Sequence, residues 1–155
     1  MALYLEDITP GMTFESGTYP PLTATQIVEF GSEFDPQPFH LDPLAARDTF
    51  FEGLAASGWH TAAITMRLLV QSVPIAGGLV GAGADVSWPQ AVRPGDILRT
   101  VTTIENVRRS NSKPDRGFVM ALIETFNQND EVVQRNRVRM LAFARTNDYV
   151  EQLGS

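Results

Sequence analysis

The sequence contains no cysteine. This absence excludes disulfide bonds, thiolate zinc sites and a cysteine nucleophile, and it fits a reducing compartment such as the cytoplasm. A chain of 155 residues does not need such cross-links, because a domain of this size buries roughly 70% of the surface that its unfolded chain exposes. We therefore expect a single cytoplasmic domain over residues 1–155.

Positive charge is also scarce. The chain has 12 basic and 18 acidic residues, a formal net charge of −6, which disfavours binding to a phosphate backbone as the main task. The first ten residues include Glu6 and Asp7 and lack the basic start and apolar stretch of a signal peptide. Between residues 53 and 84, polar side chains interrupt every apolar run of membrane length. We expect neither nucleic acid nor a membrane as a partner.

The order of predicted elements indicates an α+β protein. Thr23 and Gln26 form a capping box for a helix to about Glu33, a short helix is expected at 43–48, and Ser57 starts a long helix to Val73 whose apolar residues recur at helical spacing. Strands are predicted at 12–19, 79–88, 97–107, 117–127 and 132–144, with turns between the last four. Strands that follow helices predict an antiparallel sheet with the long helix across its concave face. We expect the apolar residues of this helix to be core: Trp59, Ala62, Ala63, Met66, Leu69, Val70 and Val73.

The run from Asp35 to His40 places a carboxylate and an imidazole five residues apart. Pro36 and Pro38 disfavour helix in the residues before them, so we expect an extended loop that aims both side chains into one cavity. Taken singly, an Asp before Pro is usually a turn former and a lone His is usually structural. Their pairing favours an acid/base site, because adding water to a double bond requires proton transfer at both water and carbon.

Two segments, Phe34 to Pro43 and Ala55 to Thr61, resemble the hydratase signature of MaoC-like dehydratases. The stretch Val86-Ser87-Trp88 and the turn from Val92 to Asp96 also resemble that family. The resemblance implies a hot-dog fold and an (R)-specific 2-enoyl-CoA hydratase, or the reverse dehydratase, of fatty acid metabolism. It also implies that Asp35 and His40 hold and activate the water, and that the backbone N–H of Gly58 binds the thioester oxygen. The chain departs from the signature at Pro36 and at Gln37, where the family often has Asn.

The residues around Gly58 support an oxyanion site independently. Gly58 stands at the start of the predicted long helix, where N–H donors are unpaired and the helix dipole favours negative charge. Hydration of an enoyl thioester builds negative charge on the thioester oxygen. The protein thus supplies every group required, so no cofactor is expected, and coenzyme A enters only as part of the substrate.

Other candidate residues favour structural roles. His60 is expected to be a packed, hydrogen-bonded core residue, and no metal site is expected because the chain lacks paired ligand spacing. Three arginines alternate on the last predicted strand and therefore share one face: Arg135, Arg137 and Arg139. We favour a solvated outer surface for this face over contact with the phosphates of coenzyme A. The same holds for the cluster Arg108, Arg109, Lys113 and Arg116.

Two other functions remain open, a hot-dog acyl-CoA thioesterase and a non-catalytic acyl-thioester binding module, because one fold hosts several chemistries. The carrier can be coenzyme A or acyl carrier protein. We expect a homodimer or larger homo-oligomer, because one sheet with one covering helix leaves an edge or an apolar face to protect. An acyl tunnel is expected around Phe39, Phe50, Phe51, Leu54 and Met66.

Overall fold

The computed structural model describes residues 1–145. A short strand, β1 (Thr13–Glu15), comes first. It is followed by the helices α1 (Ala24–Phe34), α2 (Pro38–Leu41) and α3 (Gly58–Ser72), and then by the strands β2 (Val80–Ser87), β3 (Arg99–Arg109), β4 (Arg116–Phe126) and β5 (Val132–Phe143). Two 3-10 helices, η1 (Leu5–Asp7) and η2 (Ala45–Asp48), complete the described part. The predicted α+β class is confirmed.

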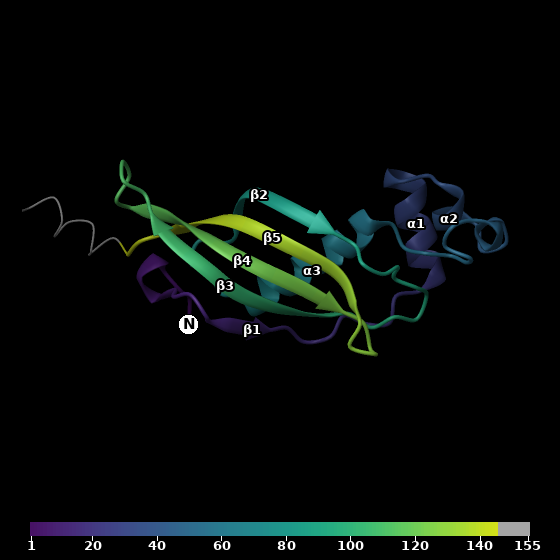
Figure 1. Cartoon of the computed structure of the whole chain (residues 1–155), viewed down its shortest axis with the longest axis horizontal. Helices are drawn as coiled ribbons and strands as arrows, with labels where there is room; N and C mark the ends of the chain where they lie inside the picture. Colours follow the sequence, from purple (N-terminus) through teal and green to yellow (C-terminus); the bar gives the residue numbers. More distant parts are fainter. Residues whose placement is uncertain (146–155) are drawn as a thin grey trace, which may run out of the picture.

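The strands form one antiparallel sheet in the order β1-β3-β4-β5-β2. Figure 1 shows α3 lying behind this sheet, and α1 and α2 at one end of the molecule. The main core lies between α3 and the sheet, where Leu69 and Val73 pack with Ile104, Val119 and Ile123. This is the long helix across a curved antiparallel sheet that the sequence predicts.

The helix α3 begins and ends where its sequence indicates, but a different face is buried. Its buried residues are His60, Thr61, Ile64, Thr65, Leu68 and Leu69. The prediction that Trp59, Met66 and Val70 belong to the core was wrong, because they are 60%, 45% and 56% exposed. Ala63, also expected in the core, is exposed as well. Apolar residues lie all around this helix, so their spacing alone does not predict which face is buried. Thr65 can be buried because its hydroxyl forms a 2.7 Å hydrogen bond with that of Thr125.

Two predicted boundaries also need correction. The first strand was expected over 12–19 but is regular only at Thr13–Glu15. Beyond it the chain keeps isolated backbone hydrogen bonds, from Ser16 N to the Thr100 carbonyl of β3 at 3.0 Å and from Tyr19 N to the carbonyl of Leu98, just before β3, at 2.7 Å. The segment expected to be extended contains the helical turn α2, with Pro38 at its first position, where a missing N–H costs nothing. His40 therefore lies on a helix and not on an extended loop.

Candidate active site

Asp35 is positioned by the end of α1. The capping box of Thr23 and Gln26 starts this helix, and Asp35 closes it by donating its backbone N–H to the Gly31 carbonyl at 2.9 Å. Pro36 follows and prevents the helix from continuing. Gly31 also lets α2 approach, because a Cβ at that position would lie 3.0 Å from both the Cβ and the carbonyl oxygen of His40.

The structure brings Asp35 and His40 together, as the sequence predicts. The Nε2 atom of His40 lies 3.2 Å from Oδ2 of Asp35. The other ring nitrogen, Nδ1, lies 2.7 Å from the Ala55 carbonyl, which can only accept a hydrogen bond, so Nδ1 carries a proton. In the neutral ring Nε2 is then the basic nitrogen, and it faces Asp35. His40 is only 4% exposed, so its orientation is held by the surrounding packing.

The Asp35 carboxylate receives hydrogen bonds at both oxygens. Gln37 Nε2 donates to Oδ1 at 2.6 Å, and Ser57 Oγ donates to Oδ2 at 2.7 Å. Burial by itself raises the pKa of Asp35, but these two hydrogen bonds and the neighbouring His40 outweigh it and hold the pKa below its ordinary value of 3.8. Asp35 is therefore an anion at neutral pH, suited to accept hydrogen bonds and to stabilise a protonated imidazole.

Ser57 links the acid/base pair to the start of α3. Its Oγ donates to Asp35 and accepts a 3.3 Å hydrogen bond from the Trp59 backbone N–H, so one side chain caps the helix and holds the carboxylate. Gly58 follows as the first residue of α3, and an N–H in this position has no acceptor within the helix. The predicted oxyanion donor and the predicted acid/base pair thus lie on adjoining segments.

Only glycine fits at position 58. A Cβ there would lie 2.6 Å from Cε2 of Trp88 and 2.8 Å from its Cδ2, closer than carbon atoms approach without a shift. Trp88 is fixed on its other side by a 2.9 Å hydrogen bond from Nε1 to Oε1 of Gln134. The indole therefore packs directly on the backbone of the oxyanion segment.

A cavity of about 390 Å³ lies beside the pair of Asp35 and His40. His40 lines it and Asp35 does not, so the expectation that both side chains point into one cavity holds only for His40. The lining of the cavity also includes Gly58 and Trp88 together with Phe39, Phe50 and Phe51. Three of the five residues expected to shape an acyl tunnel are therefore present. Leu54 belongs instead to a buried core cluster, and Met66 is exposed on α3.

The guanidinium of Arg93 clamps the loop that contains the cavity residue Phe51. Arg93 donates from Nη1 to the carbonyls of Gly53 at 3.0 Å and Leu54 at 3.3 Å, and from Nη2 to that of Phe51. Its own turn is closed by a 2.8 Å hydrogen bond from its backbone N–H to Asp96 Oδ2. The clamp fixes the loop that presents Phe51 to the cavity and leads to the Ala55 carbonyl.

Sequence reasoning missed four contributors to the site: the carboxylate donors Gln37 and Ser57, the wall residue Trp88, and the clamp residue Arg93. Ser57 was identified only as a helix cap, and Gln37 only as a departure from the family signature. The adjacency of Ser57 to Gly58 was an available signal for the first. No local pattern indicates that Arg93 reaches a loop about 40 positions earlier.

His60 is packed as predicted but is not fully hydrogen-bonded. Its ring stacks on Phe30 with centroids 4.5 Å apart and planes 4° apart, and its buried Nδ1 has no hydrogen-bond partner within residues 1–145. Burial lowers the pKa of His60 below its ordinary value of 6.5. The neutral ring is thus the form that the folded protein accommodates.

We expect the free energy of unfolding to fall as the pH is lowered from 6.5. Below that value the unfolded chain binds a proton at His60 that the folded chain does not bind, so stability rises with pH in this range, by at most about 1.4 kcal/mol per pH unit. Urea denaturation of the wild type and of His60→Phe at pH 7.5 and 5.5 measures the effect. The variant keeps the aromatic stack and should lose most of the pH dependence; an unchanged dependence would assign it to other groups.

Neither a metal site nor a membrane span emerges from residues 1–145. No group of three or more His, Asp or Glu side chains in this part could hold a metal ion. None of its helices is both long and apolar enough to cross a bilayer.

Comparison with known proteins identifies close relatives. The profile of the MaoC like domain matches residues 7–123. The crystal structure of the MaoC-like dehydratase from Rhodospirillum rubrum is 52% identical, with a TM-score of 0.90, and the match covers 93% of this chain and 99% of that one. The uncharacterized protein YdeM of Bacillus subtilis (strain 168) is 28% identical over 140 residues, which are 88% of this chain and 96% of YdeM.

A more distant structure has the same fold. The unliganded (R)-hydratase PhaJ1 from Pseudomonas aeruginosa is 20% identical, with a TM-score of 0.74, and the match covers 93% of this chain and 88% of that one. At this identity the likeness concerns the fold alone. Together with the dehydratase from R. rubrum, it confirms the predicted hot-dog fold.

Proposed function

This chain belongs to the MaoC-like domain family, and we propose that it is a hydro-lyase that adds water reversibly to a trans-2-enoyl thioester. The product is a 3-hydroxyacyl thioester of (R) configuration, and the carrier is coenzyme A. The observation that carries the proposal is the 3.2 Å pair of His40 Nε2 and Asp35 Oδ2, whose histidine lines the same cavity as Gly58.

His40 and Asp35 divide the proton chemistry between them. Asp35 accepts a hydrogen bond from the attacking water and orients it, while Nε2 of His40 takes the proton as the water oxygen bonds to C3. The Asp35 anion stabilises the imidazolium that results. The proton then passes to C2, so that the elements of one water are added and both residues return to their starting states. No cofactor takes part in these steps.

Gly58 stabilises the negative charge that develops during the reaction. Attack at C3 moves negative charge onto the thioester oxygen, and Gly58, the first residue of α3, lines the cavity in which that oxygen would lie. A single well-placed oxyanion donor lowers a barrier by about 3 to 4 kcal/mol. The apolar side chains of Phe39, Phe50 and Phe51 offer the surface for the acyl chain.

A spectrophotometric panel tests the proposal. Short, medium and long trans-2-enoyl-CoAs are mixed with the protein, and loss of the enoyl-thioester absorbance is followed while a colorimetric thiol reagent reports hydrolysis. We expect absorbance loss without thiol release, and an (R)-3-hydroxyacyl product. Thiol release from saturated acyl-CoA would favour a thioesterase, and binding without turnover would favour a non-catalytic module.

We also propose a homodimer, in which a second copy covers β2 and the exposed stripe of α3. The edge strand β2 exposes seven of its eight residues and contains neither Lys nor Pro, the residues that usually protect an edge. The opposite edge, β1, has only three residues. Trp59, Met66 and Val70 leave an apolar stripe on α3, which is unusual for a helix with no partner.

The dimer is tested by placing charge on both surfaces. Wild-type protein at micromolar concentration should sediment as a dimer, and Met66→Lys/Ala84→Lys as a monomer, because a two-fold contact would bring the added charges of both copies together. Thr13→Lys/Thr18→Lys adds the same charge at exposed positions near the opposite edge and should remain a dimer. A monomeric wild type, or dissociation of both variants alike, would contradict the assignment.

A further inference from the structure

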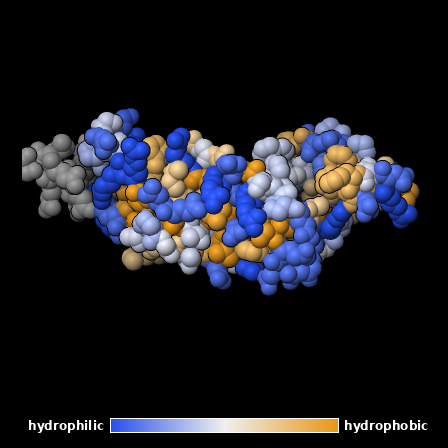
Figure 2. All heavy atoms as spheres, in the orientation of Figure 1, coloured by the Kyte–Doolittle hydropathy of each residue, from blue (hydrophilic) through white to orange (hydrophobic). Residues whose placement is uncertain are grey.

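Arginines on the outer face of the sheet fall into two groups. Arg135 and Arg137 are exposed and pair with carboxylates, at 3.1 Å from Glu124 and 3.4 Å from Glu105. Arg139, next on the same face, lies instead over the ring of Phe118, 5.2 Å from its centroid, and its Nη2 donates to the Ala82 carbonyl at 3.5 Å. Hydrophilic and hydrophobic side chains are interspersed on this face (Figure 2). Paired and unpaired arginines thus occupy one strand.

A β-bulge in β3 brings a second arginine to the same face. The pairing of β3 with β4 shifts between Ile104 and Asn106, so Glu105 and Asn106 are both exposed and the alternation reverses beyond them. Asn106 then pairs with Met120, and Arg108 with Phe118. Without the bulge, the strand alternation would turn Arg108 towards the core. The bulge therefore aligns Arg108 with the side chains around Arg139.

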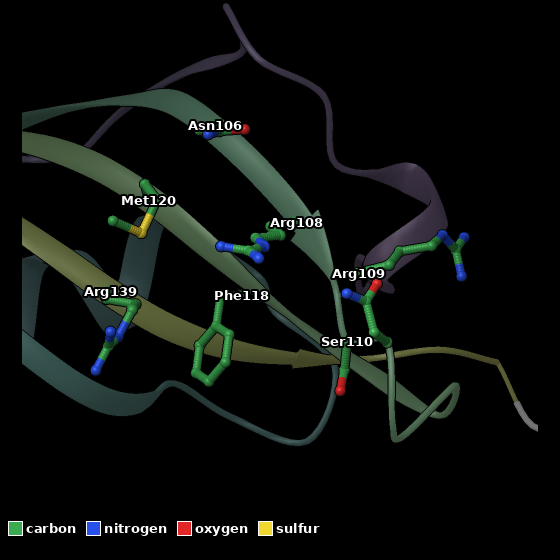
Figure 3. A pocket seen from close by; sticks show the side chains of 8 residues that line it. Asn106, Arg108, Arg109, Ser110, Phe118, Met120 and Arg139 are labelled. Atoms are coloured by element: carbon green, nitrogen blue, oxygen red, sulfur yellow. The ribbon is translucent and has the colours of Figure 1, made fainter.

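These side chains line a cavity of about 380 Å³. Its lining is Asn106, Arg108, Arg109, Ser110, Asn111, Phe118, Met120 and Arg139, without an acidic residue. Figure 3 shows Phe118 between Arg108 and Arg139, with Arg109 at the margin. In the part of the chain that the structure describes, none of the three arginines has a carboxylate ion-pair partner.

We propose that this cavity is a second binding site, for a small molecule that carries a phosphate group and a flat ring. Guanidinium groups bind phosphate through paired N–H donors, and Asn106, Ser110 and Asn111 add neutral hydrogen-bonding groups at the rim. Phe118 and Met120 supply an apolar floor for the ring. Three arginines that form no ion pair with a carboxylate within residues 1–145 would be stabilised by a bound anion.

The site is separate from the candidate active site. It lies by the β3–β4 connection, at the end of the sheet away from α1 and α2 (Figure 1), and it shares no lining residue with the cavity of His40. The inference does not rest on the proposed hydratase activity, so binding can be measured without any turnover.

Calorimetric titration with ADP and with inorganic pyrophosphate tests the site. We expect both to bind and ADP to bind more tightly, because only ADP has a ring for Phe118. Arg108→Gln and Arg139→Gln should each weaken ADP binding by about ten-fold or more. Arg135→Gln removes an equal charge from the same face of β5, but from a guanidinium already paired with Glu124, and should bind ADP like the wild type.

Three results would overturn the proposal. They are failure of both probes to bind at millimolar concentration, equal weakening by Arg135→Gln and Arg139→Gln, and pyrophosphate binding as tightly as ADP. Thermal unfolding of each variant shows whether it is folded. Arg108 and Arg139 lie on different strands, so either variant can decide the outcome if the other fails to fold.

Discussion

Replacement of His40 by alanine is expected to lower kcat for hydration of an enoyl thioester by about 10²- to 10⁴-fold. The substitution removes the basic nitrogen that faces Asp35 and the Nδ1–H bond to the Ala55 carbonyl. Asp35→Asn should produce a loss of similar size, because it removes the charge that stabilises the imidazolium while keeping the shape of the side chain. Steady-state kinetics with the best substrate of the panel measures both.

The double variant distinguishes a joint role from two separate ones. If both residues act on one water, Asp35→Asn/His40→Ala should be little worse than the poorer single variant, because residues that act as a unit are not additive. His60→Phe is the matched control, since it removes the other histidine without touching the pair, and its activity at pH 7.5 should stay close to that of the wild type. Wild-type activity in Asp35→Asn or His40→Ala would contradict the role proposed for that residue.

The second large effect is expected from Gly58→Ala. The new methyl group would lie 2.6 Å from the Trp88 ring, so the indole or the start of α3 must move, although the backbone N–H itself is kept. A displacement of about 1 Å at a reacting centre costs up to about 10²-fold in rate. We expect kcat/KM to fall by about 10- to 10²-fold, while the circular dichroism spectrum remains that of the folded protein.

A double-mutant cycle assigns this effect to its cause. Trp88→Leu removes the ring that the methyl group would meet, so Gly58→Ala should cost much less in that background than in the wild type. Gly17→Ala adds the same methyl group where nothing lies within 4 Å and should leave kinetics unchanged. If Gly58→Ala lowered kcat/KM equally in both backgrounds, contact with Trp88 would not be the reason that glycine is required at position 58.

Local signals in the sequence predict much of the framework. The Thr23 capping box and Ser57 place the starts of α1 and α3, and Pro36 and Pro74 follow the positions where these helices end. The four long strands lie within two residues of their predicted limits. These features depend on backbone donors, caps and prolines, which act over a few residues and can therefore be recognised without the fold.

The features that were not predicted depend on contacts between distant segments. The buried face of α3 is selected by packing against the sheet and by the hydroxyl of Thr125. The role of Ser57 depends on a hydrogen bond to Asp35, 22 positions earlier. The bulge at Glu105 reverses an alternation that otherwise looks regular. The pairing of Arg135 with Glu124 on the neighbouring strand β4, and of Arg137 with Glu105 one strand further on, depends on sheet register.

Incubation with short, medium and long trans-2-enoyl-CoAs in water labelled with heavy oxygen tests the central claim most directly. Mass spectrometry of the products locates the oxygen that came from water. The account predicts one labelled oxygen in an intact 3-hydroxyacyl thioester, with no label in free acid, and loss of this product in Asp35→Asn. Label in a released carboxylate, or an unlabelled and unchanged thioester for every chain length, would contradict it.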